Sequence, residues 1–158
     1  MNTIGETIGE LCKIILPIPE ESYTGNPDSS IAVCTLSSID LLKKFVNSEI
    51  LNHISIAGRL LSENKGIDSI IKHVNKNQKI TTIIVCGKEV LGHKAGHSLF
   101  RLHKNGVDKN KRIINSTSPN PHLTVSKSEI QFFQNNITLV NLINETDFEI
   151  ILDKIRIS

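Results

Sequence analysis

The chain has 158 residues, of which 39% are hydrophobic and 4% aromatic, and its formal net charge at pH 7 is +2. One domain of this length buries roughly two-thirds of the surface that its unfolded chain exposes, so it can fold without disulfides or a structural metal. The basic residues are scattered and have few aromatic neighbours, so the sequence argues against a nucleic-acid partner.

The cysteines and the apolar runs indicate in which cellular compartment the protein is expected. Cys12, Cys34 and Cys86 are an odd number without C-x-x-C spacing, and two of them lie in apolar strand-like runs. They predict reduced core cysteines in a cytoplasmic protein. The N-terminus lacks the order of a signal peptide, and no apolar run approaches the roughly 20 residues of a membrane span. We therefore expect a soluble cytoplasmic protein.

The first half of the chain alternates between strand and helix patterns. Residues 3–15 carry apolar side chains at helical spacing, and residues 16–30 hold so many turn-forming residues that we expect a loop without regular structure. Strands are predicted at 31–36, 53–58 and 80–86. A helix is expected after each strand: one capped by Ser37 or Ser38, one carrying Ile67 to Val74, and one carrying Leu99 to His103 that stops at Gly106.

The second half continues this alternation. A charged loop at 107–112 precedes a short predicted strand, Ile113-Ile114, and a proline-containing loop at 116–123. Ser126 and Glu129 have the spacing of a capping box at the start of a helix. A strand is predicted at 137–143, and Thr146 or Asp147 is expected to cap the last helix.

Alternating strands and helices predict the fold class. Parallel neighbours need right-handed crossovers, which place helices on both faces of the sheet. We expect one α/β domain over residues 1–158, a Rossmann-like three-layer domain with a mostly parallel sheet of about five strands. Ligands bind such sheets beyond the carboxyl ends of the strands, so the loops after Leu36, Gly58, Cys86 and Ile114 are expected on one rim.

The segment from Val85 to His97 holds the densest cluster of glycines and histidines. Gly87, Gly92 and Gly96 remove side chains where a strand leads into a helix, so a bulky ligand could approach the backbone. The spacing matches neither G-x-G-x-x-G nor a P-loop. The glycines alone leave ligand contact and plain tight turning open.

Glu89, His93 and His97 are spaced four residues apart. If the helix extends back to Glu89, the three share one face and form a plausible zinc site. A helix N-terminus also favours a neutral imidazole, the form that binds metals. The alternative is a partly exposed helix whose Glu89 and His97 are simply solvated, and the spacing does not decide between them.

Catalysis by side chains alone is not indicated. Cys34 and Cys86 lie within apolar strand runs, and no Gly-x-Ser-x-Gly motif is present. Glu63 and Asp68 flank the second strand-to-helix turn, where carboxylates more often favour the helix N-terminus than perform acid–base chemistry.

Several runs in chain order carry a family resemblance over residues 16–143. The runs include Leu16-Pro-Ile-Pro19, Gly25 to Leu36, Ile56-Ala-Gly58, Ser62 to Ile67, Cys86 to Gly96, Leu102 to Asp108 and Val140 to Ile143. In these runs the sequence resembles the cobamide-binding A subunit of the tetrahydromethanopterin S-methyltransferase of methanogenic archaea.

The resemblance implies a Rossmann-like domain that binds a cobamide (cobalamin or a related corrinoid), with His93 of the Gly-His-x-x-Gly segment as lower axial ligand of the cobalt. The cofactor then carries the chemistry, and no side chain is catalytic. A separate pterin-dependent methyltransferase subunit would deliver the methyl group of a methyl-tetrahydropterin, and a thiol or other acceptor would receive it, so the chain is not expected to act alone. The other implied cofactor contacts are Thr35, Leu36, Gly58, Asn64, Gly87, Glu89, Gly92, Gly96 and Pro121.

Two departures from known patterns matter. The Asp-x-His-x-x-Gly motif of other corrinoid proteins has Leu91 in place of its aspartate, so any group that orients His93 must come from elsewhere. Members of the family also end in a membrane anchor, which we do not expect here. The second hypothesis is a non-catalytic binding or regulatory module of the same fold, possibly holding zinc through Glu89, His93 and His97.

Overall fold

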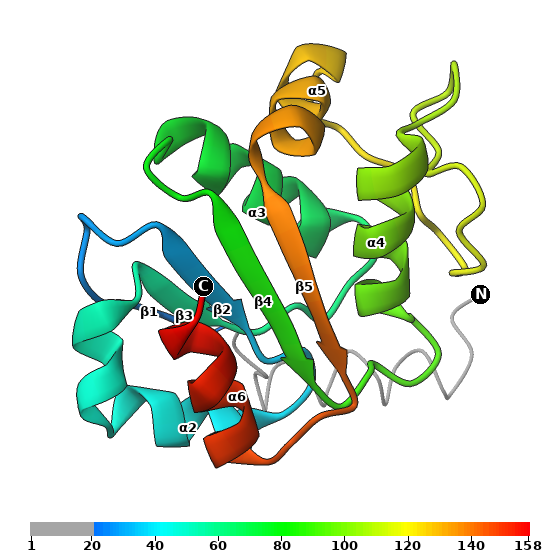
Figure 1. Cartoon of the computed structure of the whole chain (residues 1–158). Coiled ribbons are helices and arrows are strands. Elements are labelled where there is room, and N and C mark those ends of the chain that lie inside the picture. The colour runs from blue at the N-terminus through cyan, green and yellow to red at the C-terminus, as the bar shows by residue number, and fades with distance from the viewer. Residues whose placement is uncertain (1–20) are drawn as a thin grey trace.

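A computed structural model describes residues 21–158 of the chain. The helix predicted at 3–15, with Cys12, lies outside the described residues. Five strands form one sheet in the order β1-β3-β2-β4-β5 (Figure 1). They are β1 (Ser22–Thr24), β2 (Ile31–Cys34), β3 (Ile56–Gly58), β4 (Thr82–Gly87) and β5 (Thr138–Ile143). Strands β3, β2, β4 and β5 are parallel, and β1 pairs antiparallel with β3, which confirms the mostly parallel sheet.

Helices cover both faces of this sheet, which confirms the three-layer α/β arrangement. Residues of α3 (Lys65–Lys76), α4 (Ala95–Asn105) and α5 (Lys127–Asn136) pack in one apolar cluster, and residues of α2 (Ile39–Val46) and α6 (Phe148–Arg156) pack in the other. Strand β4 contributes alternate residues to the two clusters, Ile83 and Val85 to one and Ile84 and Cys86 to the other. This period of two explains why a central strand reads as a continuous apolar run.

Three predictions of local structure were wrong. Ser22–Thr24 lies in the expected loop but forms β1, because pairing with β3 overrides the turn-forming residues on either side. Ile113-Ile114 is no strand of the sheet: Val107 with Ile113, and Arg112 with His122, form only isolated bridges. The second strand begins at Ile56, and the 3₁₀ helix η1 (Glu49–His53) precedes it.

The predicted helix ends were largely confirmed. Ser126 and Glu129 form a complete capping box at α5, and Asp147 accepts two backbone N–H bonds at the start of α6. Gly106 follows α4 with a φ of 69°, which a glycine adopts without strain. Ser38 occupies the N-cap position of α2, but its hydroxyl instead accepts the N–H of Lys88 at 2.9 Å.

The connections that leave the neighbouring strands β2 and β4 run toward opposite edges of the sheet. From β2 it continues through α2 to β3 on one side, and from β4 it continues through α4 to β5 on the other, with α2 and α4 on opposite faces. Open α/β sheets bind ligands at such a switch point. Within residues 21–158, no helix is long and apolar enough to cross a membrane.

Candidate functional site

Hydrogen bonds join the loops that follow β2 and β4 at the carboxyl end of the sheet. The N–H of Ser37 donates to the carbonyl of Lys88 at 3.1 Å, and the Ser37 hydroxyl donates to the same carbonyl at 2.8 Å. Gly87 has a φ of +79°, and a Cβ there would lie 2.2 Å from the carbonyl oxygen of Thr35. Only glycine therefore lets the two loops pack this closely.

Glu89 closes the N-terminus of α4 from outside the helix. One carboxylate oxygen accepts the N–H of Val90 at 2.8 Å and of Gly96 at 3.0 Å, and the other accepts the N–H of His97 at 2.8 Å. Lys94 precedes the helix in the left-handed region, with a φ of 48° and no side-chain cap of its own. The helix begins at Ala95, so Glu89 and His93 lie before it rather than on one of its faces.

The predicted zinc arrangement does not form. The Glu89 carboxylate bonds to backbone, Nε2 of His97 accepts the N–H of Thr117 at 3.2 Å, and His93 turns toward Glu63. No group of three or more His, Cys, Asp or Glu side chains among residues 21–158 could hold a metal ion. The equal spacing of the three residues was misleading because the helix starts too late to align them.

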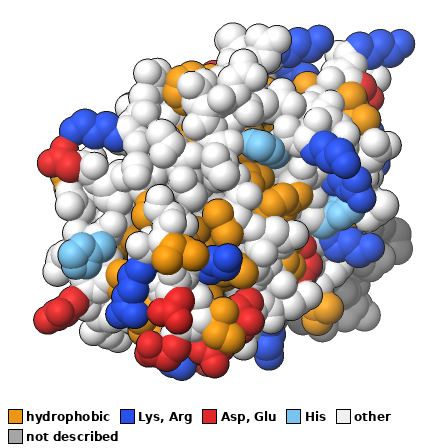
Figure 2. All heavy atoms as spheres, viewed as in Figure 1, with side chains coloured by type: hydrophobic (Ala, Val, Ile, Leu, Met, Phe, Trp, Pro, Cys, Tyr) orange, Lys and Arg blue, Asp and Glu red, His pale blue; other side chains and the backbone are white. Residues whose placement is uncertain are grey.

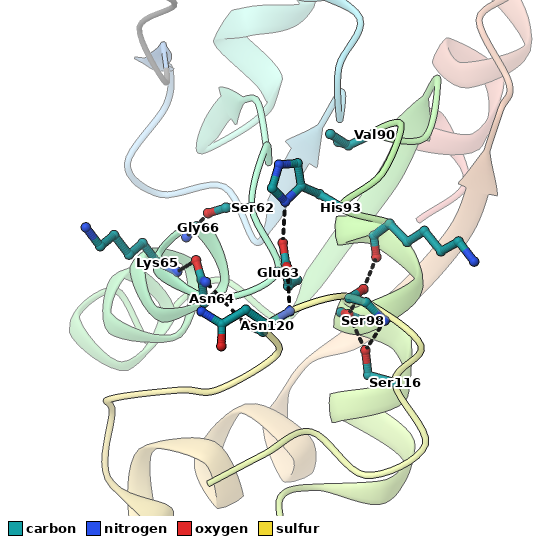
Figure 3. Close-up of polar contacts among 12 residues, drawn as sticks. Ser62, Glu63, Asn64, Lys65, Gly66, Val90, His93, Ser98, Ser116 and Asn120 are labelled. Carbon is teal, nitrogen blue, oxygen red and sulfur yellow. Dashed lines mark hydrogen bonds and ion pairs between the residues drawn. The ribbon is translucent and has the colours of Figure 1, made fainter. Parts of the chain in front are cut away.

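His93 and Glu63 form the central contact of the site (Figure 3). Nδ1 of His93 lies 2.8 Å from a carboxylate oxygen of Glu63, and the exposed fractions of the two side chains are 54% and 2%. The other Glu63 oxygen accepts the N–H of Asn120 at 2.9 Å. Burial alone would raise the pKa of Glu63, but hydrogen bonds from the N–H groups of Glu63 and Asn120 and from His93 outweigh it, so the pKa is lowered.

This hydrogen bond fixes the tautomer and the orientation of the His93 imidazole. Glu63 is ionised at neutral pH, so Nδ1 of His93 carries the proton of the hydrogen bond. In the neutral ring the lone pair then belongs to Nε2, on the side turned away from Glu63 (Figure 3). Histidines that ligate a metal usually donate their other ring N–H to a carboxylate, carbonyl or water in this way.

The segment from Ser116 to Asn120 lies against both the Glu63 loop and α4. Nδ2 of Asn64 donates to the carbonyl of Asn120 at 3.1 Å, beside the Asn120 contact with Glu63. At the other end, the buried hydroxyl of Ser98 lies 2.7 Å from that of Ser116 and 2.6 Å from that of Ser118. The loop after Ile114 thus reaches the same rim as the other three, as expected.

The glycines of the stretch differ in their surroundings. A Cβ on Gly92, whose φ is +78°, would meet nothing within 4 Å, so its open side faces free space. A Cβ on Gly96 would lie 2.9 Å from the Glu89 carboxylate and 3.1 Å from Leu36. Packing within the protein is therefore enough to require a glycine at this position. Contact of either residue with a cofactor stays a prediction.

The other predicted contact residues lie around this rim. Thr35, Leu36 and Pro121 are buried, Asn64 is half-buried, and the N–H of Thr35 donates to the carbonyl of Gly58 at 2.8 Å. The cysteines take no part, because burial raises the pKa of Cys34 to about 12 and also raises that of Cys86.

Sequence reasoning did not assign Glu63 and Asn120 to the site. Glu63 was interpreted as a carboxylate near a helix start, and its near-complete burial was not visible in the sequence. A usable signal was the absence of the aspartate at Leu91: a histidine ligand without its usual carboxylate needs one from another segment. Leu91 itself is 96% exposed.

Comparison with known proteins now identifies the family. The model of the family described as the A subunit of tetrahydromethanopterin S-methyltransferase matches residues 16–157. The chain belongs to this family of tetrahydromethanopterin S-methyltransferase A subunits. It is 38% identical over 142 residues to the A subunit of a putative methyltransferase, Mtx, of Methanosarcina barkeri, a match that covers 89% of this chain and 68% of that protein.

Two further relatives show the same likeness. The A subunit of the putative methyltransferase Mtx of Methanosarcina acetivorans is 39% identical over 84% of this chain and 64% of its own length. Form 1 of the tetrahydromethanopterin S-methyltransferase A subunit of Methanothermobacter thermautotrophicus is 35% identical over 89% of this chain. The match spans 58% of the length of the latter protein.

Proposed function

We propose that this chain is a corrinoid-binding methyl carrier in which Nε2 of His93 is the lower axial ligand of the cobalt. The observation that carries the proposal is the contact between Nδ1 of the half-exposed His93 and the buried carboxylate of Glu63. Membership of a methyltransferase subunit family supports methyl transfer as the activity. The site lies at the switch point of the sheet, where this fold class binds ligands.

The residues present fit a cobamide. The donor is a single imidazole nitrogen with its other nitrogen already hydrogen-bonded, and a lone axial histidine needs no further protein ligand. A Cβ on Gly92 would meet no described atom within 4 Å apart from its chain neighbours, so a ligand could approach the backbone there. When bound, the cofactor would supply the metal that accepts and gives up the methyl group.

The chain's own residues would hold the cofactor and orient the His93 ring. Glu63 keeps the Nδ1 proton of His93 in place and leaves the Nε2 lone pair available. The N–H of Asn120 and the surrounding backbone keep Glu63 ionised. In this proposal no side chain of the site serves as nucleophile or general base, and partner enzymes carry out both transfers.

We infer the partners from the names of the relatives. An A subunit of a tetrahydromethanopterin S-methyltransferase belongs to a multi-subunit enzyme, so the proposed methyl donor is a methyl-tetrahydropterin held by a pterin-dependent methyltransferase subunit. The proposed acceptor is a thiol or another acceptor. We place the protein in the cytoplasm, where both reactants are expected.

Reconstitution with hydroxocobalamin tests the ligand assignment. We expect the visible spectrum of the cofactor to change on binding, and the change to be lost in His93→Ala and kept in His53→Ala, which replaces an exposed histidine of η1. In the cobalt(II) state, the nitrogen triplet in the electron paramagnetic resonance spectrum should become a doublet when histidine is labelled with ¹⁵N.

Three results would overturn the proposal. A spectrum identical to that of free cofactor in the presence of excess protein would show that the chain does not bind it. A shift that survives His93→Ala, or a triplet unaffected by labelled histidine, would show that the axial ligand is a different group.

A further inference from the structure

A groove runs between α4 and the edge strand β5. Its volume is about 610 Å³, and Phe100, Arg101 and Lys104 of α4 line it together with Asn141 and Ile143 of β5. His97 and Glu89 lie at the end nearest the candidate site. Basic side chains gather on this part of the surface, over α4 (Figure 2).

The groove carries a positive charge that the described residues leave unbalanced. Among the described residues that line it, Arg101 and Lys104 are cationic and Glu89 alone is acidic, so the cations outnumber the carboxylate. Neither Arg101 nor Lys104 takes part in an ion pair within residues 21–158. Clustered cations on a surface attract and orient anionic partners.

The backbone of β5 adds a second recognition element. The N–H of Thr138 donates to the carbonyl of Thr81, so even-numbered residues of β5 bond toward β4. Residues 139, 141 and 143 therefore direct their N–H and C=O groups away from the sheet. Asn141 Oδ1 accepts the N–H of Ile143 at 3.1 Å, while in the described part of the chain no strand pairs with Leu139 or Asn141 on this side.

We propose that this groove binds an extended, acidic segment of a partner protein, which adds to the sheet beside β5 and places carboxylates against Arg101 and Lys104. Strand addition uses the outward N–H and C=O groups of a free edge, and side chains of the added strand confer specificity. A second copy of the chain fits less well, because pairing two β5 edges would bring two cationic α4 helices together.

The groove and the candidate cofactor site share a boundary. The pKa of His97 is lowered by burial and by Arg101 and Lys94, while Glu89 raises it. Carboxylates bound at Arg101 would offset the cationic neighbours and favour the protonated ring. His97 therefore reports occupancy of the groove, and a partner seated there would contact the segment that carries His93.

The test uses the full chain without added corrinoid, so its outcome does not depend on the proposed function. The probe is a blocked peptide of alternating Glu and Val, and the comparison peptide replaces each Glu with Lys. We expect fluorescence anisotropy to show binding of the acidic peptide only, with an affinity that falls as NaCl is added. The Arg101→Glu/Lys104→Glu variant should bind at least tenfold more weakly.

Matched variants distinguish the contribution of charge from that of the β5 edge and check that the protein remains folded. Lys43→Glu/Lys44→Glu reverses two exposed charges on α2, on the opposite face, and should leave the affinity within twofold. Asn141→Pro removes one outward N–H and should weaken binding, with circular dichroism confirming that the variant is folded. The nuclear magnetic resonance titration of His97 should move to higher pH when the acidic peptide is bound.

Four results would overturn the proposal. Equal affinity for the two peptides, or equal weakening by the α2 and α4 charge reversals, would show that the groove does not select acidic segments. Peptide binding without movement of the His97 titration would place the peptide elsewhere. A concentration-dependent dimer that Asn141→Pro dissociates would identify a second copy as the occupant of the edge.

Discussion

Glu63 determines the tautomer and the orientation of the His93 ring. Its carboxylate is almost fully buried, yet it stays ionised because N–H groups surround it. An arrangement in which a carboxylate holds Nδ1 of a histidine fixes both the tautomer and the direction of Nε2. Here the carboxylate comes from the loop after β3, thirty residues before the histidine, rather than from the position two residues before it.

Replacing Glu63 with Gln tests this role. The amide can accept only one of the two N–H groups that the carboxylate accepts, and its NH₂ must face the other. We expect the affinity for hydroxocobalamin to fall about 10- to 100-fold, as for other groups that orient metal ligands. Titration followed by the visible spectrum gives the affinity. Exposed Glu149→Gln on α6 is the control, and an unchanged affinity of Glu63→Gln would contradict the role.

His97 makes stability depend on pH through its bond to Thr117. Burial and the neighbouring Arg101 and Lys94 lower the pKa of His97 in the folded state, and a protonated ring cannot accept the Thr117 N–H. As pH falls through the ordinary value of about 6.5, the unfolded chain binds the proton first, so folding stability decreases.

Urea unfolding between pH 8 and pH 5 measures this effect. His97→Gln keeps an acceptor for Thr117 but cannot titrate, so its loss of stability over the range should be smaller than that of the parent chain. The exposed His53→Gln variant should retain the full loss. Parallel profiles for all three proteins would show that His97 does not contribute.

At the level of elements, α3 carries an aspartate with a specific task. Asp68 is buried in the first turn of α3 and accepts the N–H of Thr124 at 3.0 Å, its hydroxyl at 2.8 Å and the N–H of Val125 at 3.2 Å. These bonds tie the segment before α5 to α3. The segment also contains Pro121 and leads back to Asn120, so its position affects the candidate site.

Asp68→Ala should therefore destabilise the fold by about 2–4 kcal/mol, because buried N–H groups of the 124–125 segment lose their acceptor. The matched control is Asp40→Ala, an exposed aspartate in the first turn of α2, whose effect should stay within about 0.5 kcal/mol. Urea denaturation compares the two. Similar small losses for both would show that the Asp68 bonds add little to stability.

Sequence patterns predicted the elements better than their junctions. Apolar periodicity located β2, β4, β5 and the five α-helices of the described part, because each buries one face against a neighbour. The start of α4 at Ala95 was left open because it depends on the Glu89 carboxylate and on the left-handed Lys94, which no local pattern encodes. Strand β1 was missed because only its pairing with β3 makes it a strand.

Sequence reasoning also predicted only part of the candidate site, because the rest depends on contacts between distant segments. The resemblance selected His93 over His97, and the structure gives His93 an exposed ring with a buried carboxylate partner. Glu63 and Asn120 come from segments far from residue 93 in the chain, and their meeting depends on the sheet order. One sequence contains no direct record of such distant contacts.

At the scale of the whole molecule, the fold brings four loops to one rim. The loops after β2 and β4 bond to each other, and the segment from Ser116 to Asn120 bridges the Glu63 loop and the start of α4. A ligand held at His93 would contact elements from both halves of the chain. Its binding energy should therefore stabilise the entire fold rather than one loop.

Thermal unfolding with hydroxocobalamin tests this global coupling. A ligand that binds only the folded state adds about 2.7 kcal/mol at a concentration 100 times its Kd. For a chain of this length, that gain corresponds to a rise in Tm of roughly 5–10 °C. The rise should be smaller at the same cofactor concentration in His93→Ala, because the weaker affinity reduces the ratio of cofactor to Kd. A rise in one cooperative transition would show that the rim couples the two halves of the domain, whereas separate transitions in the loaded protein would contradict a single cooperative unit.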